Sequence, residues 1–490
     1  MAENIFGALT IILYELMLFC GFWILILALD DVAVDIYWFY KRRQRKKLYY
    51  HSAPPMRSNQ LPLPQSIAPK SLFAFFIPTW NEGSIIAQML NNLTSTLSHT
   101  PFAYKIYVGA YPNDPDGIKQ IKLAARINPK ITLVICDKNG PTTKANCLNM
   151  IWKALQTDEL NSGFKAQAII LHDAEDMVHA DSLAIYAHLL RRHAFVQLPV
   201  IPQPVAKSPF ISGHYCDEFA ESHAKQMMVR EWLSTGMPMA GVGCAINREW
   251  IARLALQHHN LPFDEDSLTE DYELGIKLSQ MGASGAIADM LDAHGERVGT
   301  KSCFPDKMEN AVKQKSRWLL GIALNGWDRL GWGASPMDNW MRMQDRKGPF
   351  VAIILFACYI LIILSGIIWT AQAFGLTQQK PLPHSAIILL TLNAIFMLWR
   401  VIMRASFTYR LYGLKQSLYS VPRIFISNLI AILAVRRAIW AYVKWLKGQR
   451  LIWEKTSHLH FPATAQMHVN PAHFGHDNAL NIAHEKEQNI

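Results

Sequence analysis

Three carboxylates are crowded into one short segment of the chain, residues 172–176 (HDAED). The segment directly follows an apolar run, residues 168–171, that has the composition of a buried strand. The negative charges of Asp173, Glu175 and Asp176 repel one another unless a cation or protonation relieves them. Mg²⁺ and Mn²⁺ prefer oxygen ligands and commonly take one or two carboxylates together with substrate phosphates. The segment therefore predicts a divalent metal and a phosphate-bearing substrate, the alternative being a solvated turn or a helix N-cap.

Two further groups of residues that could take part in catalysis or binding lie nearer the C-terminus. Thr269, Glu270 and Asp271 open a helical pattern over residues 272–281, where Thr269 could be an N-cap and the helix dipole favours both acids. Residues 314–318 (QKSRW) are cationic and aromatic. In a functional role the arginine of this segment could hold a diphosphate and the tryptophan could face a sugar ring. The alternative is an amphipathic helix that leads to the membrane.

The elements that must position these groups alternate between apolar runs and amphipathic stretches. Short apolar runs predict strands at residues 72–77, 105–110, 131–136 and 168–171, and helical patterns lie between them at 85–97 and 145–155. This alternation predicts an α/β domain with a largely parallel sheet over about residues 70–345. Ligands of such sheets bind beyond the carboxyl ends of the strands. The polar residues that follow the first three runs include Pro78, Trp80, Glu82, Asp114 and Lys144.

Composition narrows the class of protein. The chain has 490 residues, 51% of them apolar and 18% charged, which excludes a disordered or fibrous chain and implies more than one folded unit. A net charge of +10 suits anionic lipid, nucleic acid or a phosphorylated small molecule. Nucleic acid ranks last, because much of the basic charge flanks apolar stretches and no nucleic-acid motif is present. The seven cysteines form no closely spaced set, which excludes a zinc ribbon and a disulfide scaffold.

Three apolar stretches, residues 5–29, 350–374 and about 382–403, are long enough to cross a hydrocarbon layer of about 30 Å. Lys and Arg after the first stretch and on the outer ends of the other two are expected in the cytoplasm by the positive-inside rule. This arrangement places the N-terminus outside, and the α/β domain and the C-terminus in the cytoplasm. A fourth span after residue 405 would have to bury Arg436 and Arg437, so we predict an interfacial amphipathic helix there instead.

The domain boundaries predicted from these patterns follow the chain in order. They are an N-terminal anchor at 1–40, a basic and Pro-containing linker at 41–69, the α/β domain at 70–345, a transmembrane hairpin at 346–404, the interfacial amphipathic region at 405–462 and a polar, His-containing tail at 463–490.

The motifs PxWNE, PND, KANCLN, DAED, GVG, TED and QxxRW, taken in this order, make the chain resemble the membrane-integrated family 2 glycosyltransferases, which include cellulose and hyaluronan synthases. Met-Val-His after DAED, the stretch TEDYELG and residues 453–458 (WEKTSH) are similar to a bacterial subgroup, the bacteriophage adsorption protein B type. The resemblance spans about residues 5–462. It implies a GT-A type fold for the cytoplasmic domain and a place in the bacterial inner membrane.

The resemblance also implies roles for individual residues. Asp173 matches the first acid of the family's metal-binding DxD motif; Glu175 stands at the third position and Asp176 follows, so both remain candidate ligands for Mg²⁺ or Mn²⁺. Asp271 matches the catalytic base, with Glu270 beside it. The residues expected at the donor are Pro78, Trp80, Glu82, Asp114, Lys144, Asp173 and Arg317, and those expected at the acceptor are Gly241, Gly243, Gln314 and Trp318.

The expected function is an inverting transfer of sugar from a nucleotide-sugar donor, UDP-linked, to a growing polysaccharide. Export of the polymer would involve a partner in the outer membrane. One alternative is a single transfer to a lipid-linked acceptor, and another is a catalytically silent envelope scaffold or phage-adsorption component. The retention of Asp173, Asp271 and Arg317 argues against a silent scaffold, because such clustered charges are costly without a function.

Overall fold

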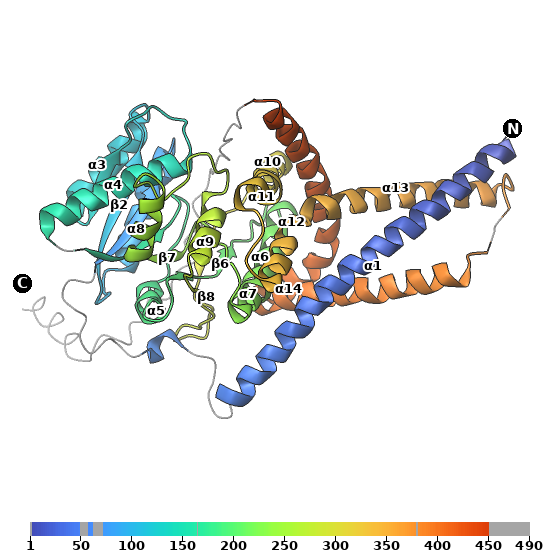
Figure 1. The fold of residues 1–490 in the computed structure, drawn as a ribbon, viewed down its shortest axis with the longest axis horizontal. Helices are drawn as coiled ribbons and strands as arrows, with labels where there is room; N and C mark the ends of the chain where they lie inside the picture. Colours follow the sequence, from blue (N-terminus) through green and yellow to red (C-terminus); the bar gives the residue numbers. More distant parts are fainter. Residues whose placement is uncertain (1, 50–56, 62–71, 164, 379–380, 450–490) are drawn as a thin grey trace, which may run out of the picture.

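The structure is a computed structural model that describes residues 2–49, 57–61, 72–163, 165–378 and 381–449. The predicted tail, residues 453–458 and most of the predicted linker lie outside the described residues. Figure 1 shows an α/β domain at one end of the molecule and three long helices that project from it at the other end.

A seven-stranded sheet with the order β3-β2-β1-β4-β7-β5-β8 forms the centre of the α/β domain. Strand β7 is antiparallel to β4 and β5, and the other neighbouring strands are parallel. The prediction of an α/β domain with a largely parallel sheet is therefore confirmed. The strands are β1 (Leu72–Pro78), β2 (Ala103–Ala110), β3 (Ile131–Ile135), β4 (Ala166–Leu171), β5 (Phe195–Gln197), β7 (Cys244–Asn247) and β8 (Gly285–Ile287), and a separate pair is formed by β6 (Val200–Pro202) and β9 (Thr300–Ser302).

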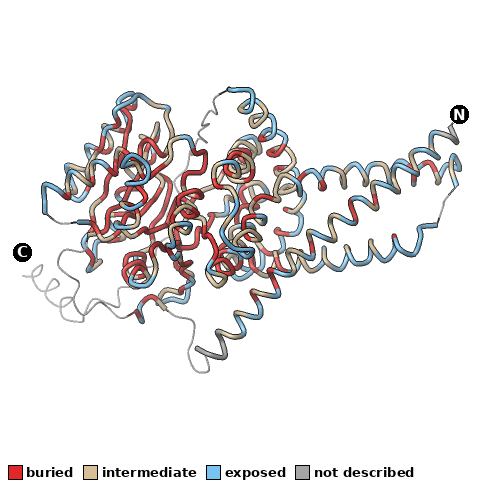
Figure 2. The backbone as a smooth tube through the Cα atoms, viewed as in Figure 1, coloured by how far each residue is buried: buried red, intermediate tan, exposed pale blue. Residues whose placement is uncertain are grey.

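Strand β1 lies between two layers of helices, and its side chains alternate between two cores. Phe73 and Phe75 belong to the core shared with α2, whereas Ala74 and Phe76 belong to the core shared with α4. Because both faces of the strand are buried, its sequence is continuously apolar rather than alternating. The red backbone segments in Figure 2 show this central layer of buried strands.

The helices of the α/β domain cover both faces of the sheet. The helix predicted at residues 145–155 is confirmed and extends further, because Thr143 caps its start through the amide of Asn146 and Gly163 ends it in the left-handed region (φ 73°). The helices are α2 (Gly83–Thr96), α3 (Pro115–Ile127), α4 (Lys144–Ser162), α5 (Ser182–Leu189), α6 (Ile211–Glu221), α7 (Met227–Leu233), α8 (Arg248–Gln257), α9 (Glu270–Gln280), α10 (Met308–Leu319), α11 (Asn325–Leu330) and α12 (Pro336–Arg346), with short turns η1 (Ser58–Gln60), η2 (Ser222–Gln226) and η3 (Leu320–Leu324).

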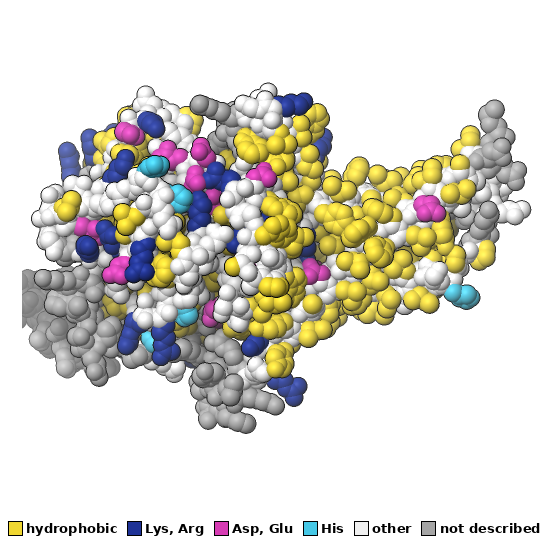
Figure 3. Space-filling view, in the orientation of Figure 1, with side chains coloured by type: hydrophobic (Ala, Val, Ile, Leu, Met, Phe, Trp, Pro, Cys, Tyr) yellow, Lys and Arg dark blue, Asp and Glu magenta, His cyan; other side chains and the backbone are white. Residues whose placement is uncertain are grey.

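Among the described residues, three helices are long and apolar enough to cross a membrane: α1 (Ala2–Tyr49), α13 (Gly348–Ala373) and α14 (His384–Leu446). The three predicted spans are thus confirmed as helices of sufficient length. Figure 3 shows an almost wholly apolar surface over these projecting helices, in contrast to the charged surface of the α/β domain. In the most apolar segments of α1, α13 and α14, only 17%, 17% and 11% of the residues are buried inside the structure. Most of this apolar surface is therefore free to contact lipid.

Helix α14 is broken at Gly413 (φ 77°), so the predicted boundary at residue 404 lies inside its first part. After Gly413 the second part packs against α6 and α10 and turns away from the membrane hairpin (Figure 1). Its opposite face carries a stripe of exposed apolar side chains at helical spacing. The stripe consists of Leu414, Leu418, Phe425, Leu429 and Trp440. This two-sided character agrees with the interfacial helix that we predicted, which remains a prediction.

A buried ion cluster fastens α14 to α6. The carboxylate of Asp217 accepts hydrogen bonds from Arg404 (3.0 Å), Arg423 (2.9 Å) and Thr408 (3.2 Å). The side chains of Asp217 and Arg423 are fully buried. A second cluster, in which Lys225 pairs with Asp35 of α1 and Glu221 of α6, ties the first membrane helix to the same place.

Replacing Asp217 by alanine is expected to lower the stability of the protein by about 3–5 kcal/mol, because the buried guanidinium of Arg423 loses its charged partner. Thermal unfolding of the purified protein in one detergent measures the change. Glu309→Ala is the matched control: Glu309 forms an ion pair with Lys313 but is 77% exposed, so its loss should leave the melting temperature unchanged. Equal melting temperatures for the two variants would contradict the structural importance of the cluster.

Candidate active site

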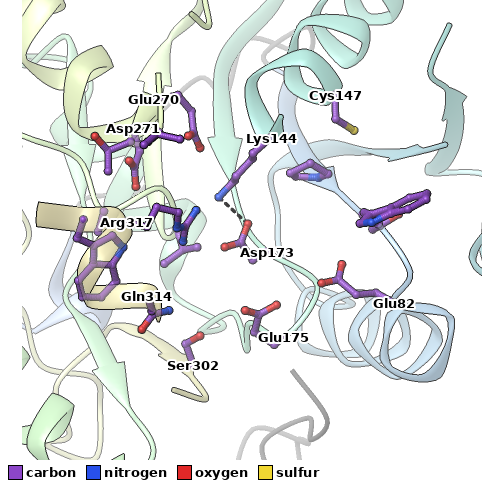
Figure 4. Close-up of a pocket in the computed structure, with 18 of the residues that line it drawn as sticks. Glu82, Lys144, Cys147, Asp173, Glu175, Glu270, Asp271, Ser302, Gln314 and Arg317 are labelled. Atoms are coloured by element: carbon purple, nitrogen blue, oxygen red, sulfur yellow. Dashed lines mark ion pairs between the residues drawn. The ribbon is translucent and has the colours of Figure 1, made fainter. Parts of the chain in front are cut away.

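A cleft with about 1150 Å³ of empty volume opens beyond the carboxyl ends of β1, β2 and β4. Segments far apart in the sequence meet in it, as Figure 4 shows. The predicted site residues that line it are Pro78, Trp80, Glu82, Lys144, Asp173, Glu175, Glu270, Asp271, Gln314, Arg317 and Trp318. Asp173 and Asp271, nearly one hundred positions apart in the chain, therefore open onto one cavity, as the sequence interpretation required.

One end of the cleft has an aromatic wall. Trp80 and Tyr111 contact each other edge to face with ring centroids 5.2 Å apart. The hydroxyl of Tyr111 lies 2.6 Å from that of Thr142, on the loop before α4. Glu82 lines the cleft with this wall, and the partly exposed ring of Trp80 is of the kind on which a nucleobase stacks.

Asp114 is placed next to this wall but is not among the residues that line the cleft. One of its carboxylate oxygens accepts from the amide of Gly117 (3.0 Å) at the start of α3, and the other accepts from the amide of Asn81 (2.8 Å). The residue therefore caps α3 and fixes the loop after β1. A direct contact of Asp114 with the donor remains a prediction.

The acidic turn after β4 separates its three carboxylates. Asp173 and Glu175 line the cleft, whereas the carboxylate of Asp176 is buried away from it and bonds the amide of Asp173 (2.8 Å). Burial, followed by the negative charges of Asp173, Glu82 and Asp176, raises the pKa of Glu175 well above its usual value. Such an excess of negative charge favours a bound cation.

Lys144 stands at the centre of the cleft, at the start of α4. Its ammonium lies 2.6 Å from a carboxylate oxygen of Asp173, as the dashed line in Figure 4 marks, and 3.4 Å from the carbonyl oxygen of Gly241. Burial by itself lowers the pKa of Lys144, but the charges of Asp173, Glu270 and Asp271 outweigh burial and raise it. Lys144 thus carries a positive charge between Asp173 on one side and Glu270 and Asp271 on the other.

Glu270 and Asp271 occupy the first turn of α9. Burial raises the pKa of Glu270 to about 7, and the neighbouring charge of Asp271 adds to the increase. Burial likewise raises the pKa of Asp271, while Lys144 and Arg317 oppose the increase. A carboxylate with a pKa raised toward neutrality is suited to accept a proton from a hydroxyl.

The two glycines predicted at the acceptor shape the space around Asp271 instead of lining the cleft with side chains. Gly241 has a φ of 73°, and a β-carbon there would collide with the carboxylate of Asp271. Gly243 has a φ of 60°, and a β-carbon there would collide with Thr300. Their neighbours Ala240 and Val242 line the cleft. A contact of the glycines with an acceptor remains a prediction.

The other end of the cleft is formed by α10 and by aromatic residues. Gln314, Arg317 and Trp318 line it together with Phe219 of α6 and Phe304. Within the part of the chain that the structure describes, the side-chain oxygen of Gln314 and Nε of Arg317 are buried without hydrogen-bond partners. This end of the cleft therefore combines aromatic rings with polar side chains.

Several residues that line the cleft were not among the predicted site residues. Tyr111 stands just before Asp114, and Thr269 just before Glu270, so nearness to the motifs could have identified them. Phe219, Ser302, Cys303 and Phe304 carry no motif signal and reach the cleft only through the packing of α6 and β9. The full set of additional lining residues is Thr79, Tyr111, Thr142, Cys147, Val200, Phe219, Ala240, Val242, Leu268, Thr269, Ser302, Cys303 and Phe304.

The acidic side chains of the cleft supply part of the ligand shell of a hard divalent ion. No group of three or more His, Cys, Asp or Glu side chains is arranged to hold a metal among the described residues. Mg²⁺ and Mn²⁺ commonly take one or two carboxylates and complete their shell with phosphates and water. The pair Asp173 and Glu175 therefore suits an ion that arrives with a diphosphate.

The sequence comparison decides the family. Residues 168–435 match the model of the glycosyl transferase family group 2. The chain belongs to this family. It therefore contains a family 2 glycosyltransferase domain, and the mostly parallel sheet is the architecture that the resemblance implied. A curated relative, bacteriophage adsorption protein B of Escherichia coli strain K12, is 32% identical over 452 residues and covers 88% of this chain. The chain spans 60% of the length of that relative.

Two solved structures are similar to this chain at low sequence identity. The mannosyltransferase PcManGT of Pyrobaculum calidifontis, solved with GDP-mannose and Mn²⁺, has 15% identity and a TM-score of 0.46 and covers 90% of this chain and 99% of its own. TarS residues 1–349 of S. aureus, solved with UDP-GlcNAc, has 11% identity and a TM-score of 0.32 and covers 64% of this chain and 94% of its own.

Proposed function

We propose that this glycosyltransferase works in the bacterial inner membrane and transfers a sugar, with inversion, from a nucleotide-sugar donor to a growing polysaccharide. The single observation that carries the proposal is the shared cleft, in which Asp173, Glu175 and Asp271 open onto one space. A UDP-linked donor is our preferred candidate.

The proposed chemistry assigns the two ends of the cleft to two partners. The nucleotide would stack at the wall of Trp80 and Tyr111, and the acceptor would lie against Trp318. Asp271 would take the proton of the acceptor hydroxyl as its oxygen attacks the anomeric carbon from the face opposite the diphosphate. Glu270, whose pKa is raised to about 7, would share that proton with its neighbour.

The departing diphosphate needs positive charge. Lys144 and Arg317 line the cleft and would supply it, with Asp173 and Glu175 holding a Mg²⁺ or Mn²⁺ ion. When bound, such an ion neutralises the diphosphate as a Lewis acid.

The proposed orientation follows the basic residues. With the α/β domain and the C-terminus in the cytoplasm and the N-terminus in the periplasm, the cleft meets cytosolic nucleotide sugars. The lipid bilayer would surround α1, α13 and the first part of α14. A polymer product would need a further partner at the outer membrane.

One observation favours the second candidate, a single transfer to a lipid-linked acceptor. Only 17%, 17% and 11% of the residues in the most apolar segments of the three described spans are buried, so these spans would need further helices to enclose a polymer path. The acceptor end of the cleft is bounded by α6 and α10, which pack against the second part of α14. An acceptor anchored in lipid could reach the cleft along that helix.

The experiment is a screen of nucleotide sugars with the protein purified in lipid nanodiscs. Release of UDP or GDP is measured with Mg²⁺ or Mn²⁺, and the labelled product is sized. A ladder of products supports a polymerase, and one sugar per acceptor supports the second candidate. If no donor is hydrolysed or transferred while the folded protein binds no nucleotide, the proposal is overturned in favour of a silent scaffold.

A further inference from the structure

The turn that carries Asp173 and Glu175 is held from below by a buried pair of side chains. The imidazole Nδ1 of His172 lies 3.1 Å from a carboxylate oxygen of Asp176. Both side chains are fully buried. The ring of His172 stacks on Phe75 of β1, with centroids 6.0 Å apart and an interplanar angle of 27°. The pair is therefore fixed in the core next to the cleft, and its side chains cannot move toward a bound ligand.

The same oxygen of Asp176 that faces His172 accepts the amide hydrogen of Asp173 at 2.8 Å. In the opposite direction, the amide of Asp176 donates to the carbonyl of Asp173 (3.2 Å). The two bonds close residues 173–176 into one rigid turn. The far side of the turn is fixed as well, because Met177 and Lys301 exchange backbone hydrogen bonds of 2.8 and 3.1 Å.

The closed turn determines where each acid points. Asp173 and Glu175 line the cleft (Figure 4), whereas Asp176 is buried and does not line it. Without the carboxylate of Asp176, the amide of Asp173 would lose its buried acceptor, and the backbone between Asp173 and Glu175 could adopt other conformations. Groups that support the ligands of an ion typically change its affinity by 10- to 100-fold when they are removed.

We infer that His172 and Asp176 are positioning residues that orient Asp173 and Glu175 toward the ion and the diphosphate, and that Asp176 is not itself a ligand. This inference rests on the proposed function. It assigns the third acid of the segment a supporting role and leaves Glu175 as the ligand at the third position of the motif.

The test measures binding of Mn²⁺ in the presence of UDP by electron paramagnetic resonance with the full chain. Asp176→Asn keeps an oxygen acceptor for the amide of Asp173, so we expect an affinity close to that of the unaltered protein. Asp176→Ala removes the acceptor and should weaken binding by about 10- to 100-fold. Glu175→Gln removes a ligand charge and should weaken binding at least as strongly as Asp176→Ala.

Two further variants separate positioning from general damage. His172→Phe retains the ring stacked on Phe75 and should weaken binding less than Asp176→Ala, since the amide of Asp173 keeps its acceptor. Asp181→Asn alters an acid of the same region that bonds Ser58 and does not line the cleft, and it should leave binding unchanged. Melting temperatures are compared so that each affinity refers to folded protein.

Three results would overturn the inference. Loss of affinity in Asp176→Asn equal to that in Glu175→Gln would make Asp176 a ligand. Unchanged affinity in folded Asp176→Ala would leave the pair without a positioning role. If the unaltered protein binds no Mn²⁺ with either UDP or GDP, the proposed donor chemistry fails, and the positioning role fails with it.

Discussion

Asp271→Asn is expected to lower turnover by about 10²- to 10⁴-fold, the usual contribution of base assistance, and to leave nucleotide binding intact. Asparagine has nearly the shape of aspartate and cannot accept the proton of the acceptor hydroxyl. Asp271 lies at the start of α9 and faces the cleft opposite Asp173 (Figure 4), so its change should not disturb the diphosphate. Sugar transfer and calorimetric binding of UDP with Mn²⁺ are the two measurements.

Two further variants test whether Asp271 is the base. Glu270→Gln, in the same turn, should lower turnover less than Asp271→Asn if Asp271 is the base. Comparable losses of turnover would indicate that the pair acts as one unit. Glu249→Gln alters an exposed acid in the first turn of α8 and should change neither transfer nor binding. Loss of UDP affinity in Asp271→Asn would instead place Asp271 in the donor site.

Lys144→Gln is expected to raise KM for the donor and to move the acid limb of the pH–rate profile to higher pH. The positive charge of Lys144 opposes the increase of the pKa of Glu270 and of Asp271. Its removal should therefore raise both pKa values further, so that more of the pair is protonated and inactive at neutral pH. The unaltered enzyme should lose activity as the pH falls below about 7, where the pair of Glu270 and Asp271 takes up protons.

The pH dependence of kcat distinguishes the two roles of the lysine. If Lys144 held only the diphosphate, KM would rise and the acid limb of kcat would stay in place. Lys138→Gln offers a control, because Lys138 precedes α4 by a few residues and does not line the cleft. If Lys144→Gln lowered kcat by the same factor at every pH, the electrostatic link between Lys144 and Asp271 would be contradicted.

The strands and the spans were predictable because each depends on local pattern. The continuous apolar run of β1 and the turn residues after it fix a buried strand and its end. The three spans follow from apolar length alone. The end of the last span was predicted at residue 404, before the break at Gly413, because a glycine inside a helical pattern does not by itself mark a break.

The site residues divide in the same way. The sequence motifs identified Asp173, Glu175, Asp271 and Arg317 as chemical groups, because the order and spacing of the motifs resemble those of a known family. The choice between Glu175 and Asp176 required coordinates. Both acids are equally available in the sequence, and only the buried ring of His172 and the amide of Asp173 turn one of them away from the cleft.

The order of residues by itself determined the family, the α/β class and the number of apolar spans, since these depend on motif spacing and on runs of apolar side chains. Tertiary structure alone decided that Lys144 stands between two sets of acids, that Phe219 and Phe304 form a wall of the cleft, and that Asp217 joins α6 to α14. The physical reason is distance along the chain: packing brings these groups together across separations that no local pattern encodes.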